Sequence, residues 1–233
     1  MNKMISKRMS AICALLENSD RVADVGCDHG YVAIELVRNK KTKRAICSDV
    51  RKAPLEKAKL HIQEALLDEY IECRLSDGLK NYEPSEVDAV IIAGMGGPLI
   101  QKILDESSQV VADIEQFILS PQSDIENFRR YLYNNKMNIE TECIIKEDNK
   151  YYFIMKARHN TEKVKDLSDL EYKYGKGLLD KKDPILRDFL AYENRQLTAL
   201  LKELEEKNVN ERVQEVRELL LANMEAMKVY EVC

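Results

Sequence analysis

The fold follows from residues 21–31, which read RVADVGCDHGY. The first half is a short apolar run, as expected of a central parallel strand that is covered on both faces. Gly26 and Gly30 then bracket a tight turn into an amphipathic helix that starts at Tyr31. Glycines in such a turn let a ligand approach the backbone closely, and the start of the next helix offers unpaired N–H groups. The stretch therefore predicts a nucleotide-binding strand–turn–helix unit.

The spacing of this turn weakens the case for a dinucleotide site. A dinucleotide fingerprint reads GxGxxG, whereas Asp28 stands two residues after Gly26, and a second acid, Asp24, lies at the strand end. The resulting DxGxxxG pattern resembles the first motif of class I S-adenosylmethionine (SAM) methyltransferases. In that motif, the strand-end acid and the glycine turn hold the methionine part of the cofactor. The glycine turn alone also fits an ordinary strand-to-helix connection, so the methyltransferase interpretation depends on the loops that follow.

Acids follow the next two predicted strands. The strand at 44–48 ends at Asp49, 19 residues after Gly30, where a carboxylate can bind the paired hydroxyls of a ribose. The strand at 71–75 is followed by SDG, residues 76–78. Each acid by itself fits a plain turn. In sequence with the first motif, they indicate a nucleoside site at the carboxyl ends of the strands.

The fourth predicted strand, residues 87–93, opens into AGMGG at 93–97. Three glycines within four residues cost conformational entropy, so we expect them to serve backbone shape or close approach of a ligand. In a doubly wound sheet, strands one and four flank the crevice where strand order reverses, which places the reaction at this loop. Neither Asn-Pro-Pro nor Asp-Pro-Pro follows the strand, which disfavours methylation of an exocyclic amine.

The remaining segments complete a seven-stranded α/β domain that closes with an antiparallel hairpin. A helix at 4–16 precedes the first strand, and its Arg8 is placed to reach the cofactor or a phosphate, or simply to face solvent. The other predicted elements are a fifth strand at 116–119, a helix at 125–133 and two hairpin strands at 137–146 and 151–156. The expected domain boundary divides residues 1–160 from residues 161–233.

The C-terminal residues have a different pattern. From Pro184, apolar positions step by four and three residues through Leu204, and again from Val209 to Met227, with KNVN between the two runs. This spacing predicts an antiparallel α-helical hairpin with coiled-coil packing. A dimerising coiled coil is the competing use of the same heptads, and we expect a monomer.

Composition limits the function classes. The six cysteines of this 233-residue chain show no CxxC or Cys/His spacing, so we expect no metal and a reduced, cytoplasmic protein. No secretory signal and no apolar span of about 18 residues appears, so we expect no membrane partner. The net charge is −5, but residues 1–60 hold 13 Lys and Arg against 7 Asp and Glu. The basic residues, which include Lys3, Lys7, Arg8, the run at 38–44, Arg51 and Lys52, form either a solvated surface or a phosphate-contacting rim beside the cofactor turn.

Taken together, DVGCDHGY, Asp49, SDG, AGMGG and the extension from YKYGKGLL at 172–179 resemble the bacterial TrmK family across nearly the whole chain. Members methylate ring N1 of the adenine at tRNA position 22. The resemblance implies a class I methyltransferase fold, SAM as cofactor and tRNA as partner. The cofactor-binding residues it implies are Arg8, Asp24, Gly26, Asp28, His29, Gly30, Asp49, Val50, Asp77, Gly78, Ala93 and Gly94. It places Gly94 to Gly97 at the target base and Asp77 at the adenine of the cofactor, and the candidate catalytic residues are Asp28, Gly94, Met95 and Gly96. The segment FILSPQ, 117–122, departs from the order expected of relatives, so Gln122 receives no role.

The chemistry suits a site with few bases. Ring N1 of adenine carries an in-plane lone pair, so methyl transfer needs alignment rather than proton removal, and positioning is worth roughly 7–11 kcal/mol in well-oriented systems. Asp28 is the candidate to stabilise the developing positive charge. His29 either contacts the base or only caps the turn. Two other functions remain open: a methyltransferase of a small molecule or protein, and a non-catalytic tRNA-binding or dimerisation module.

Overall fold

The computed structural model describes residues 5–160, 166–207 and 210–231. It divides into two compact units, Met1–Val164 and Lys165–Cys233. The domain boundary expected after residue 160 falls on residues 161–165, which lie outside the described ranges.

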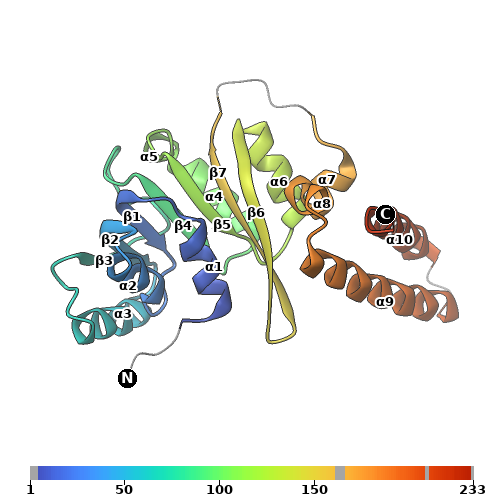
Figure 1. Ribbon diagram of the computed structural model, residues 1–233, viewed down its shortest axis with the longest axis horizontal. Helices are drawn as coiled ribbons and strands as arrows, with labels where there is room; N and C mark the ends of the chain where they lie inside the picture. The colour runs from blue at the N-terminus through green and yellow to red at the C-terminus, as the bar shows by residue number, and fades with distance from the viewer. Residues whose placement is uncertain (1–4, 161–165, 208–209, 232–233) are drawn as a thin grey trace. The chain divides into compact units, whose positions relative to one another are not determined.

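The first unit contains one seven-stranded sheet with the order β3-β2-β1-β4-β5-β7-β6 (Figure 1). Strands β1 to β5 run parallel, and β7 is antiparallel to both β5 and β6. This confirms the predicted α/β class and its closing hairpin. The strands are β1 Ser19–Val25, β2 Thr42–Asp49, β3 Ile71–Leu75, β4 Ala89–Ala93, β5 Gln116–Ser120, β6 Met137–Glu147 and β7 Lys150–His159.

Helices cover the sheet on both faces (Figure 1). They are α1 Lys7–Leu15, α2 Tyr31–Arg38, α3 Lys52–Glu64, α4 Gly97–Glu106, α5 Ser108–Val111 and α6 Ile125–Asn134. Helix α1 starts later than expected because the Ser6 side chain accepts a hydrogen bond from the Met9 amide and so caps it. Met4, where the predicted helix began, lies outside the described residues. The short helix α5 was not expected.

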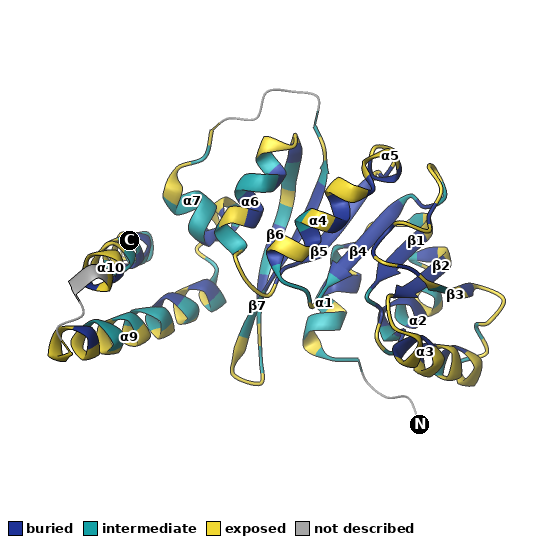
Figure 2. Cartoon of the chain, turned by 180° about the vertical axis from the view of Figure 1, so that it is seen from behind, coloured by how far each residue is buried: buried dark blue, intermediate teal, exposed yellow. Residues whose placement is uncertain are grey.

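The core lies between the sheet and these helices. One apolar cluster joins Val22, Ile91 and Ile118 of the sheet to Leu16 and to Leu36 of α2. Figure 2 shows the central strands buried while the outer surface of α3 is exposed. Because β1 and β4 are neighbours while their connections run to opposite sides, strand order reverses between them. The carboxyl ends of β1 and β4 therefore flank the crevice in which such folds bind ligands.

A buried ion pair joins α6 to β6. The Arg129 guanidinium donates to Glu142 Oε1 from both Nε and Nη2, and both side chains are nearly inaccessible to solvent. Burial raises the pKa of Glu142, and the Arg129 charge acts in the opposite direction. The pair needs both partners, because either charge alone would be buried without compensation.

The second unit is helical, with α7 Asp169–Tyr174, α8 Lys176–Asp180, α9 Pro184–Glu206 and α10 Asn210–Lys228. Helix α9 begins where Asp183 accepts hydrogen bonds from the amides of Ile185 and Leu186. Leu204 of α9 packs with Val213 and Val216 of α10, as expected of a helical hairpin. Residues 208–209 of the connecting KNVN lie outside the described ranges, as does the apolar position Val209.

A buried amide lies inside this hairpin. Asn223 of α10 donates to the Leu190 carbonyl and to Glu193 Oε2 of α9, and it accepts from Asn194. Tyr174 of α7 donates to the same Glu193 oxygen. A buried polar network with its partners in place selects one register for the two helices. Within the described ranges, no helix has the length and apolar character to cross a membrane.

Candidate functional site

A pocket of about 360 Å³ opens at the carboxyl ends of the parallel strands. The loops after β1, β2, β4 and β5 line it, together with the start of α1. Eight residues expected from the sequence line this pocket: Arg8, Asp24, Gly26, Asp28, Asp49, Ala93, Gly94 and Met95. Six residues that received no site role from the sequence also line it, and Gln122, which was set aside, is one of them: Met9, Ile12, Cys27, Val32, Arg51 and Gln122.

Asp24 is a buried acid at the end of β1. Its side chain lines the pocket, and Oδ2 is shielded from solvent with no hydrogen-bond partner among the residues the structure describes. Burial raises the pKa of Asp24 to about 7, against a hydrogen bond with the Ala33 backbone that lowers it. A buried carboxylate oxygen without a partner is costly unless a ligand supplies a donor. The geometry therefore fits a cationic or N–H group at this position.

Asp49 ends the neighbouring strand, β2, and is also buried. Its Oδ1 accepts the Arg51 amide at 2.8 Å, and the Arg51 guanidinium lies 3.5 Å from the same oxygen. For Oδ2, no partner occurs within the described ranges. One anchored oxygen and one open oxygen, facing a pocket, suit a pair of vicinal hydroxyls.

The loops after β1 and β4 pack against each other at Gly26. A Cβ added there would stand 2.3 Å from Met95 Cε, and the glycine φ is +75°. Its amide donates to the Ser48 carbonyl at 2.8 Å, which fixes the turn to the end of β2. Glycine suits this left-handed backbone conformation, and any side chain at position 26 would require Met95 Cε to move.

Asp28 and His29 occupy the turn that leads into α2. Asp28 has a φ of 47°, in the left-handed region that Asp tolerates, and its exposed Oδ2 lies 3.3 Å from His29 Nε2. His61 of α3 donates from Nδ1 to the His29 carbonyl at 3.0 Å, and its ring stacks on Tyr31. Helix α3 thus holds the turn, and Asp28 faces the pocket while His29 does not line it.

Gly94 lies in the loop after β4, which is the loop expected to hold the target base, and it lines the pocket. A Cβ there would lie 3.7 Å from both Arg8 Nη2 and Gln122 Nε2, and the φ of +84° favours glycine. Arg8 is also held over the ring of Tyr152, with 4.9 Å between guanidinium carbon and centroid. Two side chains that are far apart in the sequence, those of Arg8 and Gln122, therefore converge on this loop.

Six expected residues lie outside the pocket lining: His29, Gly30, Val50, Asp77, Gly78 and Gly96. Asp77 pairs with Lys80 at 2.5 Å, and this ion pair holds the pKa of Asp77 below its usual value. Gly30 and Gly96 are instead the N-cap positions of α2 and α4. Val50 is 61% exposed beside Asp49, an unusual position for a large apolar side chain.

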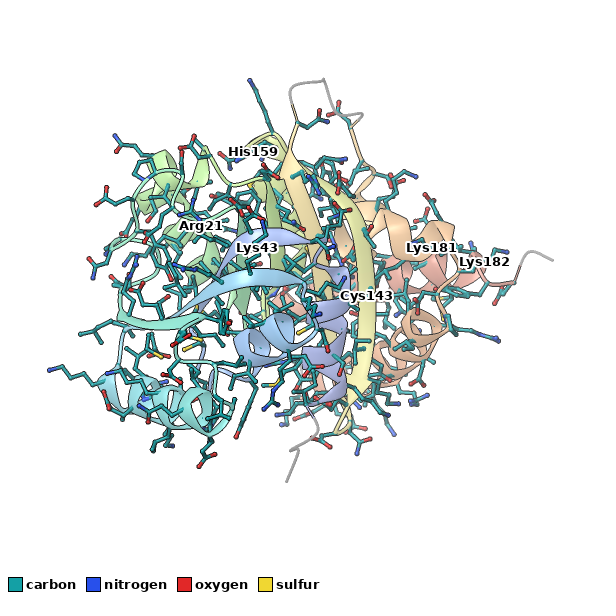
Figure 3. All side chains as sticks on the ribbon, turned by 60° about the vertical axis from the view of Figure 1, so that its left-hand side comes forward. Arg21, Lys43, Cys143, His159, Lys181 and Lys182 are labelled. Atoms are coloured by element: carbon teal, nitrogen blue, oxygen red, sulfur yellow. The ribbon has the colours of Figure 1, made fainter. Side chains whose placement is uncertain are left out.

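The basic run at 38–44 does not border the cofactor turn. It spans the end of α2 and the start of β2, so it lies at the amino edge of the sheet, opposite the pocket. Lys41 donates to the Leu16 carbonyl, and Lys43 pairs with Asp20 at 2.7 Å. Figure 3 shows Lys43 near Arg21, which belongs to the first half of β1. The hypothesis of a phosphate-contacting rim beside the cofactor turn is therefore wrong for this run, whereas Arg8 and Arg51 of the same basic share line the pocket.

Within the described residues, no group of three or more His, Cys, Asp or Glu side chains has the arrangement of a metal site. The pocket combines the buried Asp24 carboxylate, which has an oxygen without a partner, with the Asp49 carboxylate, which suits a pair of hydroxyls, and with the glycine backbone of the loop after β4. This donor set fits a nucleoside that carries an amino group.

Comparison with known proteins agrees with that chemistry. Residues 22–226 match the family model described as TrmK, tRNA (adenine(22)-N(1))-methyltransferase. A tRNA (adenine(22)-N(1))-methyltransferase of Bacillus subtilis is 34% identical over 158 residues, which span 67% of this chain and 66% of that relative.

Two solved structures with ligands are also similar. One is a candidate tRNA (m1A22) methyltransferase of Streptococcus pneumoniae in complex with SAM, with 30% identity, a TM-score of 0.87, and coverage of 96% of this chain and 100% of that one. The other is M. capricolum TrmK with S-adenosyl-homocysteine, with 28% identity, a TM-score of 0.85, and coverage of 97% and 99%.

Proposed function

This chain belongs to the family of tRNA (adenine(22)-N(1))-methyltransferases and is a SAM-dependent enzyme, and we propose that the pocket at the carboxyl ends of β1, β2 and β4 is where it performs that reaction. SAM supplies the methyl group as a sulfonium, and ring N1 of the tRNA adenine receives it. The observation that carries the site assignment is Asp24 Oδ2, a buried pocket oxygen without a partner.

Three features of the chain fit the cofactor. Asp24 binds the α-ammonium group, because an ionised carboxylate with an open oxygen is the partner that this cation needs. Asp49 accepts from the ribose hydroxyls with the oxygen that Arg51 leaves open. Val50, exposed in the structure, is covered by the adenine of the cofactor. Asp77 and Gly78 follow β3 and lie one strand further along the same edge.

The loop of Gly94 and Met95 holds the target base. Its glycine backbone lets a flat ring come close, and Gly96 caps the following helix so that the loop keeps its shape. Asp28, exposed in the turn after β1, lines the same pocket and places negative charge near the base. The methylated ring is cationic, so this charge stabilises the transition state more than the neutral ground state.

The side chains that contact the RNA phosphates are the cations near the pocket rather than the run at 38–44. Arg8 and Arg51 line the pocket, and Lys7 and Lys52 are their chain neighbours. The helical C-terminal unit supplies a second RNA contact. We further infer a monomer that acts in the cytoplasm, where its tRNA substrate resides.

The test is incubation of the protein with labelled SAM and unmodified tRNA, followed by nucleoside analysis. We expect 1-methyladenosine at position 22. Asp28→Ala and Gly94→Val should each abolish transfer while the chain stays folded, and Gly94→Val should unfold at a lower temperature because valine is strained at a φ of +84°. Gly177→Ala, in helix α8 with open space around it, serves as control. Wild-type turnover by both pocket variants would refute the site assignment, and a labelled small molecule or protein in place of tRNA would refute the substrate.

A further inference from the structure

Gln122 lies in the pocket but has no assigned role. It follows β5, its exposed side chain lines the pocket, and its backbone amide donates to the Met95 carbonyl at 2.8 Å. Its Nε2 lies 3.7 Å from the position that a Cβ would take on Gly94. This backbone hydrogen bond joins Gln122 to the loop that holds the target base. The backbone of Gln122 therefore has a fixed position relative to that loop, and its side-chain amide starts from that position.

Among the lining residues in the described part of the chain, Gln122 alone has a side chain that is both a strong donor and a strong acceptor. The lining acids, Asp24, Asp28 and Asp49, only accept when ionised, and Arg8 and Arg51 only donate. Adenine presents one donor and one acceptor side by side on each of its two readable edges. A complementary pair of hydrogen bonds from a single side chain therefore has to come from the amide of Gln122.

The reaction determines which edge that amide can read. Ring N1 must direct its lone pair at the methyl group, so a protein donor on N1 would block the nucleophile. This removes the Watson–Crick edge, which consists of N1 and the N6 amino group. The remaining pair is the N6 amino group and N7 on the opposite edge, which Gln and Asn side chains contact in a bidentate manner.

We propose that Gln122 selects the target base by accepting a hydrogen bond from the N6 amino group of adenine and donating one to N7. Guanine carries a carbonyl oxygen at the position of that amino group, so the amide oxygen would face another acceptor. The contact therefore selects adenine and at the same time turns N1 toward the cofactor. This inference rests on the proposed function and deepens it, since it adds the residue that reads the base.

The test uses two tRNAs that differ at one atom, with adenosine or 7-deazaadenosine at position 22. The second replaces N7 by C–H and so removes one of the two hydrogen bonds. For the wild-type chain we expect kcat/KM to fall roughly 10-fold on the deaza substrate. Gln122→Ala should lose roughly 10- to 100-fold on adenosine and then show about the same rate with either tRNA.

Two further variants separate base reading from a merely structural effect. Gln122→Glu places an acceptor opposite the N7 lone pair, so its preference should reverse toward the deaza substrate. Gln63→Ala removes an exposed glutamine of α3 outside the pocket and should keep the wild-type ratio. SAM affinity, measured by calorimetry, should be unchanged in all of them.

Equal discrimination against 7-deazaadenosine in the wild type and in Gln122→Ala would overturn the inference, because N7 would then be read by another group. Wild-type kcat/KM for Gln122→Ala on adenosine would do the same. If the wild-type chain transfers no methyl group to adenosine tRNA while it still binds SAM, the proposed function itself fails, and the inference with it.

Discussion

Replacement of Asp24 by asparagine tests the cofactor assignment through its pH dependence. Burial raises the pKa of this carboxyl from 3.8 to about 7, a difference of about three units, or about 4 kcal/mol at ~1.4 kcal/mol per unit. The folded chain without ligand thus holds the proton more tightly than the unfolded chain does. The stability that the protonated group contributes is complete below the unfolded pKa and is lost as the pH rises through about 7.

Cofactor binding should respond in the opposite direction. The α-ammonium group needs the ionised carboxylate, so binding has to release the Asp24 proton at low pH. With a pKa of about 7, the ionised fraction is about one half at pH 7 and about 3% at pH 5.5, which predicts roughly 15-fold weaker SAM binding at the lower pH. The free amino group of the cofactor stays mostly protonated at both values, since its own pKa is about 8.

Isothermal titration calorimetry at about pH 5.5 and 7 measures this change, and buffers of different ionisation enthalpy count the protons released. We expect Asp24→Asn to bind SAM weakly at both pH values, with no release of a proton, and to unfold at a higher temperature than the wild type above pH 7. Asp49→Asn is the matched control, because it weakens binding but leaves the pH dependence in place. SAM affinity of the wild type that is constant from pH 5.5 to 7 would refute the role of Asp24.

Three other changes test the packing that supports the site. Gly26→Ala brings a methyl group onto Met95 Cε in a left-handed backbone conformation, so we expect SAM affinity to fall at least about 10-fold. The double variant that also carries Met95→Ala should recover part of this affinity. Unchanged SAM affinity of Gly26→Ala in calorimetry would contradict the packing of the two loops. Arg129→Met leaves Glu142 as a buried lone charge and should lower the free energy of unfolding by about 3–5 kcal/mol in denaturant titration, whereas a loss below about 1 kcal/mol would show that the pair is exposed. Asn223→Ala should cost about 2 kcal/mol in unfolding of the helical unit, because the Leu190 carbonyl loses its side-chain partner, and an unchanged melting temperature would argue against the network.

The positions of the strands and of the main loops were predictable because they depend on local signals. The apolar run before Gly26 and the one before Gly94 each fill a strand covered on both faces, and the glycines mark where the strands end. The parallel arrangement then brings Asp24, Asp49 and Gly94 to one edge without further information. Differences at the ends of elements come from capping, as with Ser6 at the start of α1.

Other features depend on contacts between distant segments. Gln122 reaches the pocket only because β5 pairs with β4, and an exposed glutamine after a strand carries no signal of its own. Asp77 forms an ion pair with Lys80, and the sequence alone does not indicate whether its carboxylate binds this lysine or a ligand. The basic run at 38–44 lies away from the pocket for a simpler reason. A segment between a helix and the next parallel strand lies at the amino edge of the sheet, and the charge of the segment does not indicate its edge.

The contact between Gly26 and Met95 Cε also has a consequence for how the loops around the pocket respond to a change in one of them. Because the Cε methyl group of Met95 occupies the space beside Gly26, a larger residue at position 26 requires this side chain to move. A change of shape in the first turn is therefore transmitted to the loop after β4 through the Met95 side chain. The segment after β5 is coupled to that loop as well, because a Cβ on Gly96 or on Gly97 would stand 2.8 Å from Ser123.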